Sequence, residues 1–397
     1  MTWLDLPPDS LFGTANLPYG VFSEAGGQPP RVGVRIGDSV LDLAPALGDD
    51  VFGEPSLNAF MAQGRTRWSE VRSRITELLT DQRYQRIVEA ALRPLSQTRL
   101  HLPFVPGDYV DFFGNEYHAA NAGRLFRPGG EPLTPNWKHL PIGYHGRSGT
   151  IVLSGTPVAR PCGQRKAPDQ DAPTFGPSRQ LDFEAEVGFV IGAGSAGPVR
   201  VDDFAGHVFG VFLLNDWSSR DLQAWEARPL GPFLSKSFAT SVSPWIVPLD
   251  ALEHARISPP PRDPEPLPYL TDTGKQGLDL TLEVRLNGQF VSRPPFAATY
   301  WTAAQMLAHM TVNGASTRTG DLFASGTVSG PDRDQGGCLL ELSWGGAEPL
   351  ALADGSVRSW LEDGDEVAIS ATAPAAGGTR IGFGEVTGQI LPSPALD

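Results

Sequence analysis

The pattern of hydrophobic and polar positions changes near residue 102 of the chain. Three short strand patterns, separated by Gly, Pro and Asp turns, come first: Tyr19–Phe22, Arg31–Ile36 and Val40–Leu43. Two helical patterns follow, with apolar residues recurring at helical spacing: Trp68, Val71, Ile75, Leu78 and Leu79, then Ile87, Ala90, Ala91 and Leu92. Prolines and a glycine in the segment 102–107 predict a junction between an N-terminal domain, 1–104, and a second domain, 105–397.

Beyond the junction the chain is mostly strand patterns joined by loops. The predicted strands are Leu181–Val190, Val208–Leu214, Leu278–Leu286, Leu339–Trp344, Glu366–Ala371 and Gly384–Ile390. Pro259–Pro268 predicts a proline-dense loop. Tyr300–Val312 predicts a helix, with Met306, Leu307 and Met310 as core residues. The predicted fold class is therefore mainly β, with a few helices.

Composition and charge mainly exclude classes of protein. The 397 residues are 40% hydrophobic and 19% charged, which is typical of a globular chain. A net charge of −14 argues against nucleic acid and against anionic membranes as partners. The two cysteines, Cys162 and Cys338, offer no disulfide framework or zinc cluster. The N-terminal segment has no signal-peptide pattern, so we expect a cytoplasmic enzyme or binding protein.

The acidic residues of Leu181–Val190 are the first candidate for chemistry. Strand alternation places Asp182, Glu184 and Glu186 on one face, opposite the apolar residues. Adjacent carboxylates repel each other unless a cation lies between them, so Glu184 and Glu186 are typical of a site for a hard divalent metal. The same pattern is also typical of the solvated face of a half-buried sheet.

Three more polar positions allow a functional and a structural interpretation. Asp216 follows an apolar strand, where it belongs either to a site at the sheet rim or to the cap of the next helix. Asp111 and His118 are seven residues apart and would share one face of a helix, as a metal ligand and a base or as a cap and a surface histidine. Lys236 would stabilise developing negative charge or extend to the surface.

Gly192–Gly197 fits the glycine spacing of a dinucleotide-binding loop. That function needs a helix to open at the loop, but Pro198 follows at once and the next strand begins near Val208. We therefore predict a hairpin loop here.

Six segments, spread in order along nearly the whole chain, together carry a resemblance to one family. They are Asn16–Ser23, Pro135–Arg147, Asn215–Asp221, Pro229–Phe238, Ala324–Pro331 and Arg380–Gly384. The sequence resembles the fumarylacetoacetase family, enzymes of tyrosine and homogentisate breakdown. The resemblance implies a small SH3-like N-terminal barrel, a C-terminal β-roll catalytic domain and a homodimer.

The resemblance also implies a set of site residues. The expected metal ligands are Asp111, Glu184, Glu186 and Asp216, with Lys236 and Thr240 beside the metal. An all-oxygen donor set suits Mg²⁺, Ca²⁺ or both. His118 is the expected general base and Glu341 the carboxylate that orients it, while Lys236, Arg127 and Gln223 stabilise negative charge. The expected substrate contacts are Phe113, Arg127, Tyr144, Gln223, Ala227 and Thr327.

The implied reaction is hydrolysis of a carbon–carbon bond in the β-diketone 4-fumarylacetoacetate, which gives fumarate and acetoacetate. Two positions depart from the family pattern, because Phe113 and Ala227 stand where the family has tyrosines that contact substrate. A related acylpyruvate or diketo acid is therefore an alternative substrate. A decarboxylase or isomerase of this fold and a non-catalytic dimeric scaffold are further alternatives. The expected pairing of His118 with Glu341 favours hydrolysis over the first, and the gathered carboxylates, base and lysine argue against the second.

Overall fold

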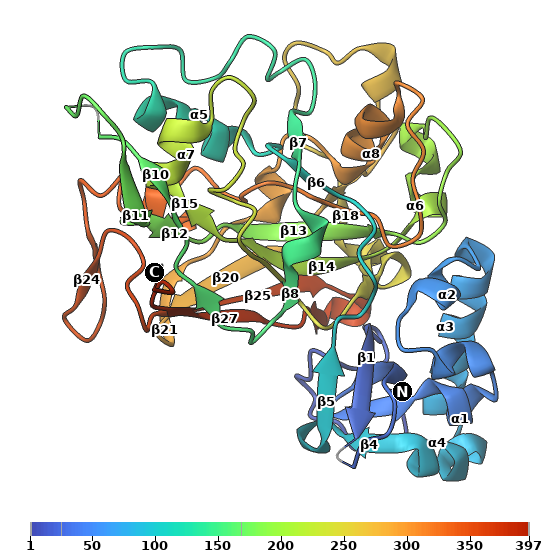
Figure 1. Ribbon diagram of the computed structural model, residues 1–397. Coiled ribbons are helices and arrows are strands. Elements are labelled where there is room, and N and C mark those ends of the chain that lie inside the picture. Colours follow the sequence, from blue (N-terminus) through green and yellow to red (C-terminus); the bar gives the residue numbers. More distant parts are fainter. Residues whose placement is uncertain (1, 25, 168, 396–397) are drawn as a thin grey trace.

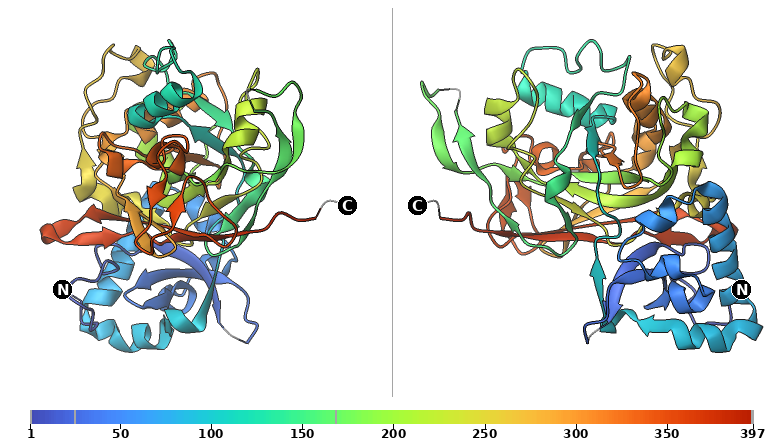
Figure 2. Two further views of the ribbon diagram at one scale, coloured as in Figure 1. Left: turned by 90° about the vertical axis from the view of Figure 1, so that its left-hand side faces the viewer. Right: turned by 45° about the vertical axis from the view of Figure 1, so that its right-hand side comes forward.

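The computed structural model describes residues 2–24, 26–167 and 169–395. Figure 1 shows a small N-terminal lobe, drawn in blue, below a larger lobe that holds the rest of the chain, and Figure 2 shows the same two lobes from two further sides. Among the described residues, no helix combines the length and the apolar run that crossing a membrane requires.

The small lobe is a five-stranded antiparallel sheet, a half-barrel, with helices packed beside it. The strand order is β4-β3-β2-β1-β5, from β1 (Tyr19–Glu24), β2 (Arg31–Ile36), β3 (Ser39–Asp42), β4 (Leu92–Pro94) and β5 (Thr98–His101). The helices are α1 (Leu43–Leu47), α2 (Asn58–Met61), α3 (Arg65–Thr80) and α4 (Gln85–Ala91). The three predicted strands are confirmed, and so is the first helix, whose five apolar residues are all buried in α3.

The second predicted helix is confirmed as α4, but the prediction of which residues it buries is wrong. Val88 and Ala91 are buried, whereas Ile87 is 46% exposed and Ala90 is also exposed. The helix ends at Ala91, and Leu92 already belongs to β4. This helix has only seven residues, and the face it buries is the one that packs against α1, α3 and β3.

The larger lobe is built on an eight-stranded and a six-stranded sheet. The first comprises β6 (Tyr109–Phe112), β7 (Gly143–His145), β8 (Ile151–Leu153), β13 (Ala185–Ile191), β14 (Val208–Asp216), β16 (Thr240–Val242), β17 (Val247–Pro248) and β22 (Leu322–Ala324). The second comprises β9 (Val158–Ala159), β20 (Thr281–Leu286), β21 (Gln289–Ser292), β25 (Glu366–Pro374), β26 (Arg380–Gly382) and β27 (Val386–Leu391). The mainly β fold class is confirmed.

Short strand pairs and helices complete this lobe. The pairs are β10 (Cys162–Arg165) with β11 (Thr174–Pro177), β12 (Leu181–Asp182) with β15 (Ser218–Ser219), β18 (Arg256–Ile257) with β19 (Gly277–Leu278), and β23 (Leu350–Ala351) with β24 (Val357–Arg358). The helices are α5 (Glu116–Phe126), α6 (Phe204–His207), α7 (Arg220–Glu226), α8 (Ala303–Thr311) and α9 (Leu339–Leu342). The predicted helix Tyr300–Val312 is confirmed as α8, which Thr302 caps.

The central strands β13 and β14 are buried along their whole length. Figure 1 shows the two large sheets stacked, with α5 and α7 on the side of the eight-stranded sheet that faces away from the six-stranded one. Val211 and Leu213 of β14 share a core with Val284 of β20. β13 pairs antiparallel with β14, which confirms that Gly192–Gly197 belongs to a hairpin connection.

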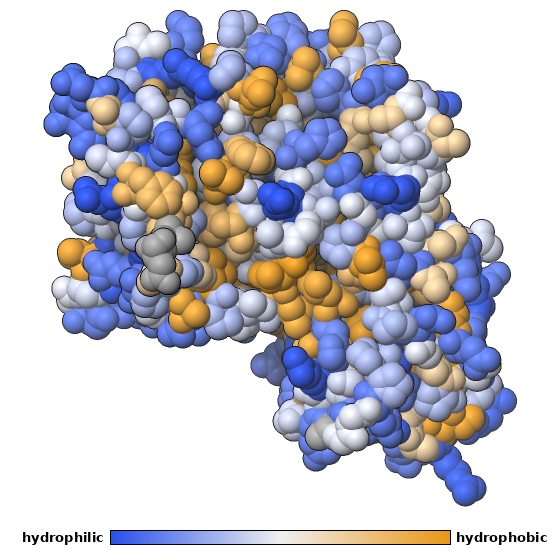
Figure 3. Space-filling model, in the orientation of Figure 1, coloured by the Kyte–Doolittle hydropathy of each residue, from blue (hydrophilic) through white to orange (hydrophobic). Residues whose placement is uncertain are grey.

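The two lobes share a second core on the other face of β14. The ring of Phe209 lies 5.4 Å from that of Tyr19, 5.7 Å from that of Phe60 and 5.3 Å from that of Trp68. Leu214 and Val190 belong to the same cluster. Figure 3 shows apolar side chains gathered on this face of the molecule where the small lobe meets the larger one. The small lobe therefore covers one face of the sheet whose strands carry the candidate site.

The predicted strand Leu339–Trp344 is wrong, because residues 339–342 form the single helical turn α9. The carboxylate of Asp182 accepts hydrogen bonds from the backbone N–H groups of Leu339 (2.7 Å) and Leu340 (3.0 Å). These two donors have no partner inside the turn, so a buried acceptor at that point stabilises a helical start. A short apolar run does not distinguish a strand from a buried helical turn.

Candidate active site

Four buried carboxylates meet at one end of the eight-stranded sheet. Asp111 lies on β6, Glu186 on β13, Asp216 on β14, and Glu184 directly before β13. One carboxylate oxygen of each lies within 4.8 Å of the others. Each residue is at most 4% exposed, so the interpretation of Glu184 and Glu186 as a solvated face is wrong. Asp216 does not cap a helix either, because it ends β14 and α7 begins at Arg220.

The carboxylate cluster (Asp111, Glu184, Glu186 and Asp216) contains buried oxygens that no described side chain or backbone group contacts by a hydrogen bond. Both oxygens of Glu186 and Oδ1 of Asp111 find no hydrogen-bond partner among the described residues. Burial, reinforced by the neighbouring carboxylates, raises the pKa of Asp111 and of Glu186 well above the ordinary range. Unpartnered carboxylates in a buried all-oxygen cluster are the donors that a hard divalent cation takes, so these residues fit such an ion.

Lys236 lies inside the site and not at the surface. Its Nζ is 2.5 Å from Oε2 of Glu184 and 2.6 Å from Oδ2 of Asp216. Burial alone would lower the pKa of Lys236, but Asp216 and Glu184 outweigh that effect and raise it, so the ammonium keeps its charge. Tyr144 donates from its hydroxyl to Oδ2 of Asp216 at 3.1 Å, and Thr240 lies directly opposite Asp216 in the β14–β16 ladder.

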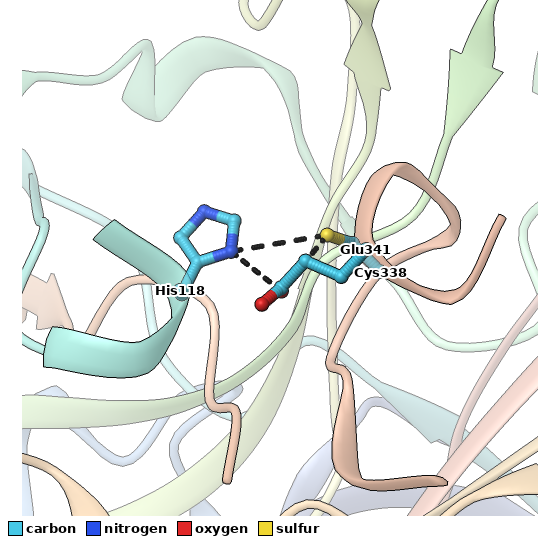
Figure 4. Close-up of side chains that lie close together, drawn as sticks. All are labelled: His118, Cys338 and Glu341. Carbon is cyan, nitrogen blue, oxygen red and sulfur yellow. Dashed lines mark hydrogen bonds and ion pairs between the residues drawn. The ribbon is translucent and has the colours of Figure 1, made fainter. Parts of the chain in front are cut away.

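His118 and Glu341 form a buried pair beside the cluster. Nδ1 of His118 lies 2.7 Å from Oε2 of Glu341. Figure 4 shows the imidazole facing this carboxylate, with Cys338 beside it. An ionised carboxylate can only accept, so Nδ1 carries a proton, and in the neutral form of the ring Nε2 is the acceptor. His118 lies on α5 and Asp111 on β6, so the expectation that they share one helix is wrong. The ring of Phe113 packs edge-on against the imidazole, with centroids 5.4 Å apart.

Three further side chains hold Glu341. Asn121 donates to Oε1 at 2.9 Å, Ser329 donates to Oε2 at 2.7 Å, and Sγ of Cys338 lies 3.3 Å from Oε2. Burial alone would raise the pKa of Glu341, but His118 and the hydrogen bonds of Asn121 and Ser329 outweigh it and hold the pKa below its ordinary value. Glu341 is therefore an ionised and fixed partner for the imidazole.

A cavity of about 550 Å³ opens onto His118 and onto two carboxylates of the cluster, Asp111 and Glu184. The predicted residues that line it are Asp111, Phe113, His118, Arg127, Tyr144, Glu184, Gln223, Ala227, Lys236 and Thr327. Glu186, Asp216, Thr240 and Glu341 lie behind this wall. All the predicted site residues are thus brought to one place.

Arg127 has a structural contact besides its place in the cavity wall, and Arg228 lies outside that wall. Arg127 donates through Nη2 to the backbone oxygen of Pro132 at 2.8 Å, so it also holds the loop that forms one wall. Arg228, the neighbour of Ala227, is exposed and is not among the described residues that line the cavity. The space beside Ala227 is therefore open to a ligand.

Sequence reasoning missed two charged residues in this region. Asp182 and Arg220 are both buried and ion-paired, with Nη1 of Arg220 also 2.7 Å from Oε1 of Glu184. The signal was present, because Asp182 belongs to the same alternation as Glu184 and Glu186, and Arg220 lies within Asn215–Asp221.

Comparisons with known proteins agree along the whole chain. Residues 15–103 match the family model described as fumarylacetoacetase N-terminal, and residues 110–391 match the one described as fumarylacetoacetate (FAA) hydrolase C-terminal. The chain is 44% identical to fumarylacetoacetases from Bos taurus, Homo sapiens and Arabidopsis thaliana, with 99% of each chain covered in each comparison.

Solved structures share the fold at low sequence identity. A fumarylacetoacetate hydrolase from Exiguobacterium antarcticum superposes with a TM-score of 0.57 at 18% identity, covering 95% of this chain and 99% of its own. A maleylpyruvate hydrolase from Sphingobium sp. SYK-6, in complex with manganese(II) and pyruvate, gives 0.55 at 17% identity, covering 95% and 100%. With both family models matched and relatives 44% identical from end to end, the chain belongs to the fumarylacetoacetase family.

Proposed function

We propose that this protein hydrolyses a carbon–carbon bond of 4-fumarylacetoacetate and releases fumarate and acetoacetate. The observation that carries the proposal is that one cavity is lined by His118, fixed by Glu341, and by Asp111 and Glu184 of the carboxylate cluster. The full-length relatives that are 44% identical and named fumarylacetoacetase support the same reaction. The reaction belongs to tyrosine breakdown.

A divalent cation completes this site in the proposal. Asp111, Glu184, Glu186 and Asp216 would hold Mg²⁺ or Ca²⁺, the hard cations that take carboxylate oxygens, with Lys236 and Thr240 beside it. When bound, the cation supplies Lewis-acid polarisation of the diketone oxygens and stabilises the enolate that leaves.

His118 is the proposed general base. With Nδ1 committed to Glu341, Nε2 is free to take a proton from a water molecule, which then attacks the carbonyl carbon. Cleavage of the carbon–carbon bond leaves its electron pair on the acetoacetate fragment. His118 then donates the proton on Nε2 to that carbon, and the imidazole is neutral again at the end of the cycle.

The remaining polar residues of the cavity bind and orient the substrate in the proposal. Lys236, Arg127 and Gln223 place positive charge and an amide where carboxylates and the developing enolate carry negative charge. Oγ1 of Thr327 is buried without a hydrogen-bond partner in the described chain, so it is available to a ligand. Tyr144 contributes a hydroxyl that already contacts Asp216.

A related acylpyruvate or diketo acid is the second candidate substrate. Phe113 and Ala227 both line the cavity, and neither offers a hydroxyl to a ligand. This wall therefore suits a less polar or bulkier acyl arm, while the cluster and His118 are unchanged.

The decisive experiment mixes the purified, Mg²⁺-loaded protein with fumarylacetoacetate and follows the loss of its ultraviolet absorbance. His118→Ala runs beside it as the control. Rapid decay that disappears in the control supports the proposal. Absence of decay in a folded protein that binds metal rejects fumarylacetoacetate and moves the test to other acylpyruvates.

We also propose a homodimer of two-domain subunits, 1–104 and 105–397, in the cytoplasm. The exposed apolar side chains Leu230, Phe233 and Leu234 support self-association, since clustered exposed apolar residues mark interaction surfaces. Light scattering behind a sizing column tests it: twice the chain mass of 42.5 kDa is expected, and a monomer mass contradicts it.

A further inference from the structure

The segment 227–239, all of it described, forms part of the cavity wall and contains no helix or strand. It connects α7, which ends at Glu226, to β16, which begins at Thr240. Its first part, which we call the flap (residues 227–235), lines the cavity with Ala227, Pro229, Leu230, Gly231 and Pro232. Since no regular ladder pairs the backbone of the flap, its position depends on hydrogen bonds to other groups.

One carboxylate holds the far end of the flap. The backbone N–H groups of Phe233 and Ser235 donate to Oε1 of Glu226, each with an N···O distance of 2.8 Å, and that of Leu234 donates to Oε2 at 3.1 Å. Successive N–H groups that converge in this way form a concavity for an anion, and the side chain of Glu226 fills it. Hydrogen bonds to a charged acceptor are stronger than those between neutral groups, so this contact is a strong one.

Apolar packing fixes little of the flap. Leu230 is 95% exposed, Phe233 is 62% exposed and Leu234 is 48% exposed. A backbone hydrogen bond from the N–H of Ser219 to the oxygen of Ser235, at 2.9 Å, holds the last residue of the flap. Glu226 therefore holds a segment that burial does not hold.

The groups that carry out the proposed reaction are held independently of the flap. His118 lies on α5, and Nζ of Lys236 is bonded to Glu184 and Asp216 of the cluster. The side chains that the flap itself adds to the wall are small or apolar, so they suit the carbon chain of a ligand rather than its carboxylates. A displaced flap would therefore weaken binding and leave the reacting groups in place.

We propose that Glu226 is a positioning residue, whose carboxylate holds the flap against the cavity and thereby sets the affinity for the carbon chain of the substrate. This inference rests on the proposed function, in which a diketo acid lies along the flap. Glu226 is not among the described residues that line the cavity, so it acts through the flap. Contacts that are equally strong in the ground state and in the transition state change KM and not kcat.

Two variants of Glu226 test the inference. Glu226→Gln keeps the size of the side chain but places an N–H₂ group where an N–H donor needs an acceptor, so we expect KM for fumarylacetoacetate to rise about 10-fold with kcat within about 3-fold of wild type. Glu226→Asp keeps the charge, so its KM should lie between the values for wild type and Glu226→Gln. A KM and a kcat of wild-type size in Glu226→Gln, or a fall in kcat at unchanged KM, would overturn the inference.

Asp354 offers a matched control. It is an exposed carboxylate that accepts from the backbone N–H of Ser356 at 2.9 Å, in the turn between β23 and β24, and it is not among the described residues that line the cavity. Asp354→Asn should leave KM and kcat at their wild-type values. An equal rise of KM in Asp354→Asn and Glu226→Gln would overturn the inference.

The oligomeric state is a second control, because the flap also carries the apolar side chains that support self-association. Light scattering should give the same mass for Glu226→Gln as for wild type. A smaller mass would assign the change in KM to assembly and would overturn the inference.

A readout that needs no substrate separates this inference from the proposed function. Hydrogen exchange followed by mass spectrometry should be faster in Glu226→Gln for the peptide that contains Phe233, Leu234 and Ser235, and unchanged there in Asp354→Asn. Faster exchange in a protein that does not hydrolyse fumarylacetoacetate rejects the proposed function and keeps the role of Glu226 in holding the flap. Unchanged exchange in an active Glu226→Gln enzyme rejects that role.

Discussion

Oε2 of Glu341 lies 2.7 Å from Nδ1 of His118, although 223 residues separate them along the chain. The contact joins α5 to α9, two helices that lie far apart in the sequence. It matters because the protonation of one imidazole nitrogen decides what the other can do.

Replacing Glu341 with Gln should lower kcat by about 10² to 10⁴-fold, the usual contribution of general base catalysis, with little change in KM. The amide can donate to Nδ1 and so favours the tautomer in which Nε2 already carries a proton. Steady-state kinetics and a thermal melt measure the effect. Glu362→Gln, at an exposed glutamate, is the control and should match wild type; a Glu341→Gln enzyme with wild-type kcat would refute the role of the pair.

Glu186→Gln should abolish metal binding measured by calorimetry without destabilising the metal-free protein. Both oxygens of Glu186 are buried without hydrogen-bond partners among the described residues. Burial and the neighbouring carboxylates raise the pKa of Glu186 despite the opposing effect of Lys236, so the metal-free state disfavours this carboxylate's charge. Added Mg²⁺ or Ca²⁺ should raise the melting temperature of wild type and leave that of the variant unchanged. Metal-dependent stabilisation that survives in Glu186→Gln would place the cation elsewhere.

Phe113→Tyr and Ala227→Tyr should each raise kcat/KM for fumarylacetoacetate by about 2- to 10-fold. Both positions line the cavity, and a hydroxyl that gains a hydrogen bond contributes about 0.5–1.5 kcal/mol. The comparison uses initial rates on fumarylacetoacetate and on a bulkier acylpyruvate. If the native substrate has a less polar acyl arm, the tyrosines will lower activity on it, and a fall on both substrates would mean that they block the cavity.

Asp365→Asn should reduce the free energy of unfolding by about 1–3 kcal/mol at pH 7, because it removes a charged acceptor from Arg358. Burial alone would raise the pKa of Asp365, but Arg358, Asn287 and the backbone of Glu362 outweigh it and hold the pKa below its ordinary 3.8. A depressed carboxyl pKa stabilises the fold above 3.8 and loses that effect as pH falls through the folded-state value. Urea unfolding measured from pH 7 down to pH 3 should therefore show the difference in unfolding free energy between wild type and Asp365→Asn becoming smaller. A difference that does not change with pH would contradict an ionic origin of the stabilisation.

Local periodicity predicted the elements whose burial follows one regular pattern. In α3 the apolar residues recur at helical spacing and face one core, so the helix and its buried residues followed directly from the sequence. In α9 the turn depends on Asp182, a residue far away in the chain, and its short apolar run indicated a strand instead. A local pattern contains no information on contacts between segments that are far apart in the sequence, so it could not predict this turn.

The same holds for the site: the sequence indicated some of its residues, and others are recognised only from their contacts in the folded chain. The alternation placed Glu184 and Glu186 together but did not reveal that both faces of β13 are buried, so that these carboxylates lie inside the molecule. The resemblance to a family brought Asp111, Asp216 and the histidine pair to the same place. It did not single out Arg220, since a buried arginine is recognised only from the partners around it.

The cluster of Phe209 with Tyr19, Phe60 and Trp68 has a consequence for how the molecule comes apart. Phe209 belongs to β14, the strand that ends in Asp216, so the same strand packs against both lobes. Without the small lobe, one apolar face of the eight-stranded sheet would be exposed to water. The two lobes should therefore unfold in a single calorimetric transition. A destabilising substitution in the small lobe would lower the amount of folded enzyme and leave the chemistry at the cavity unchanged.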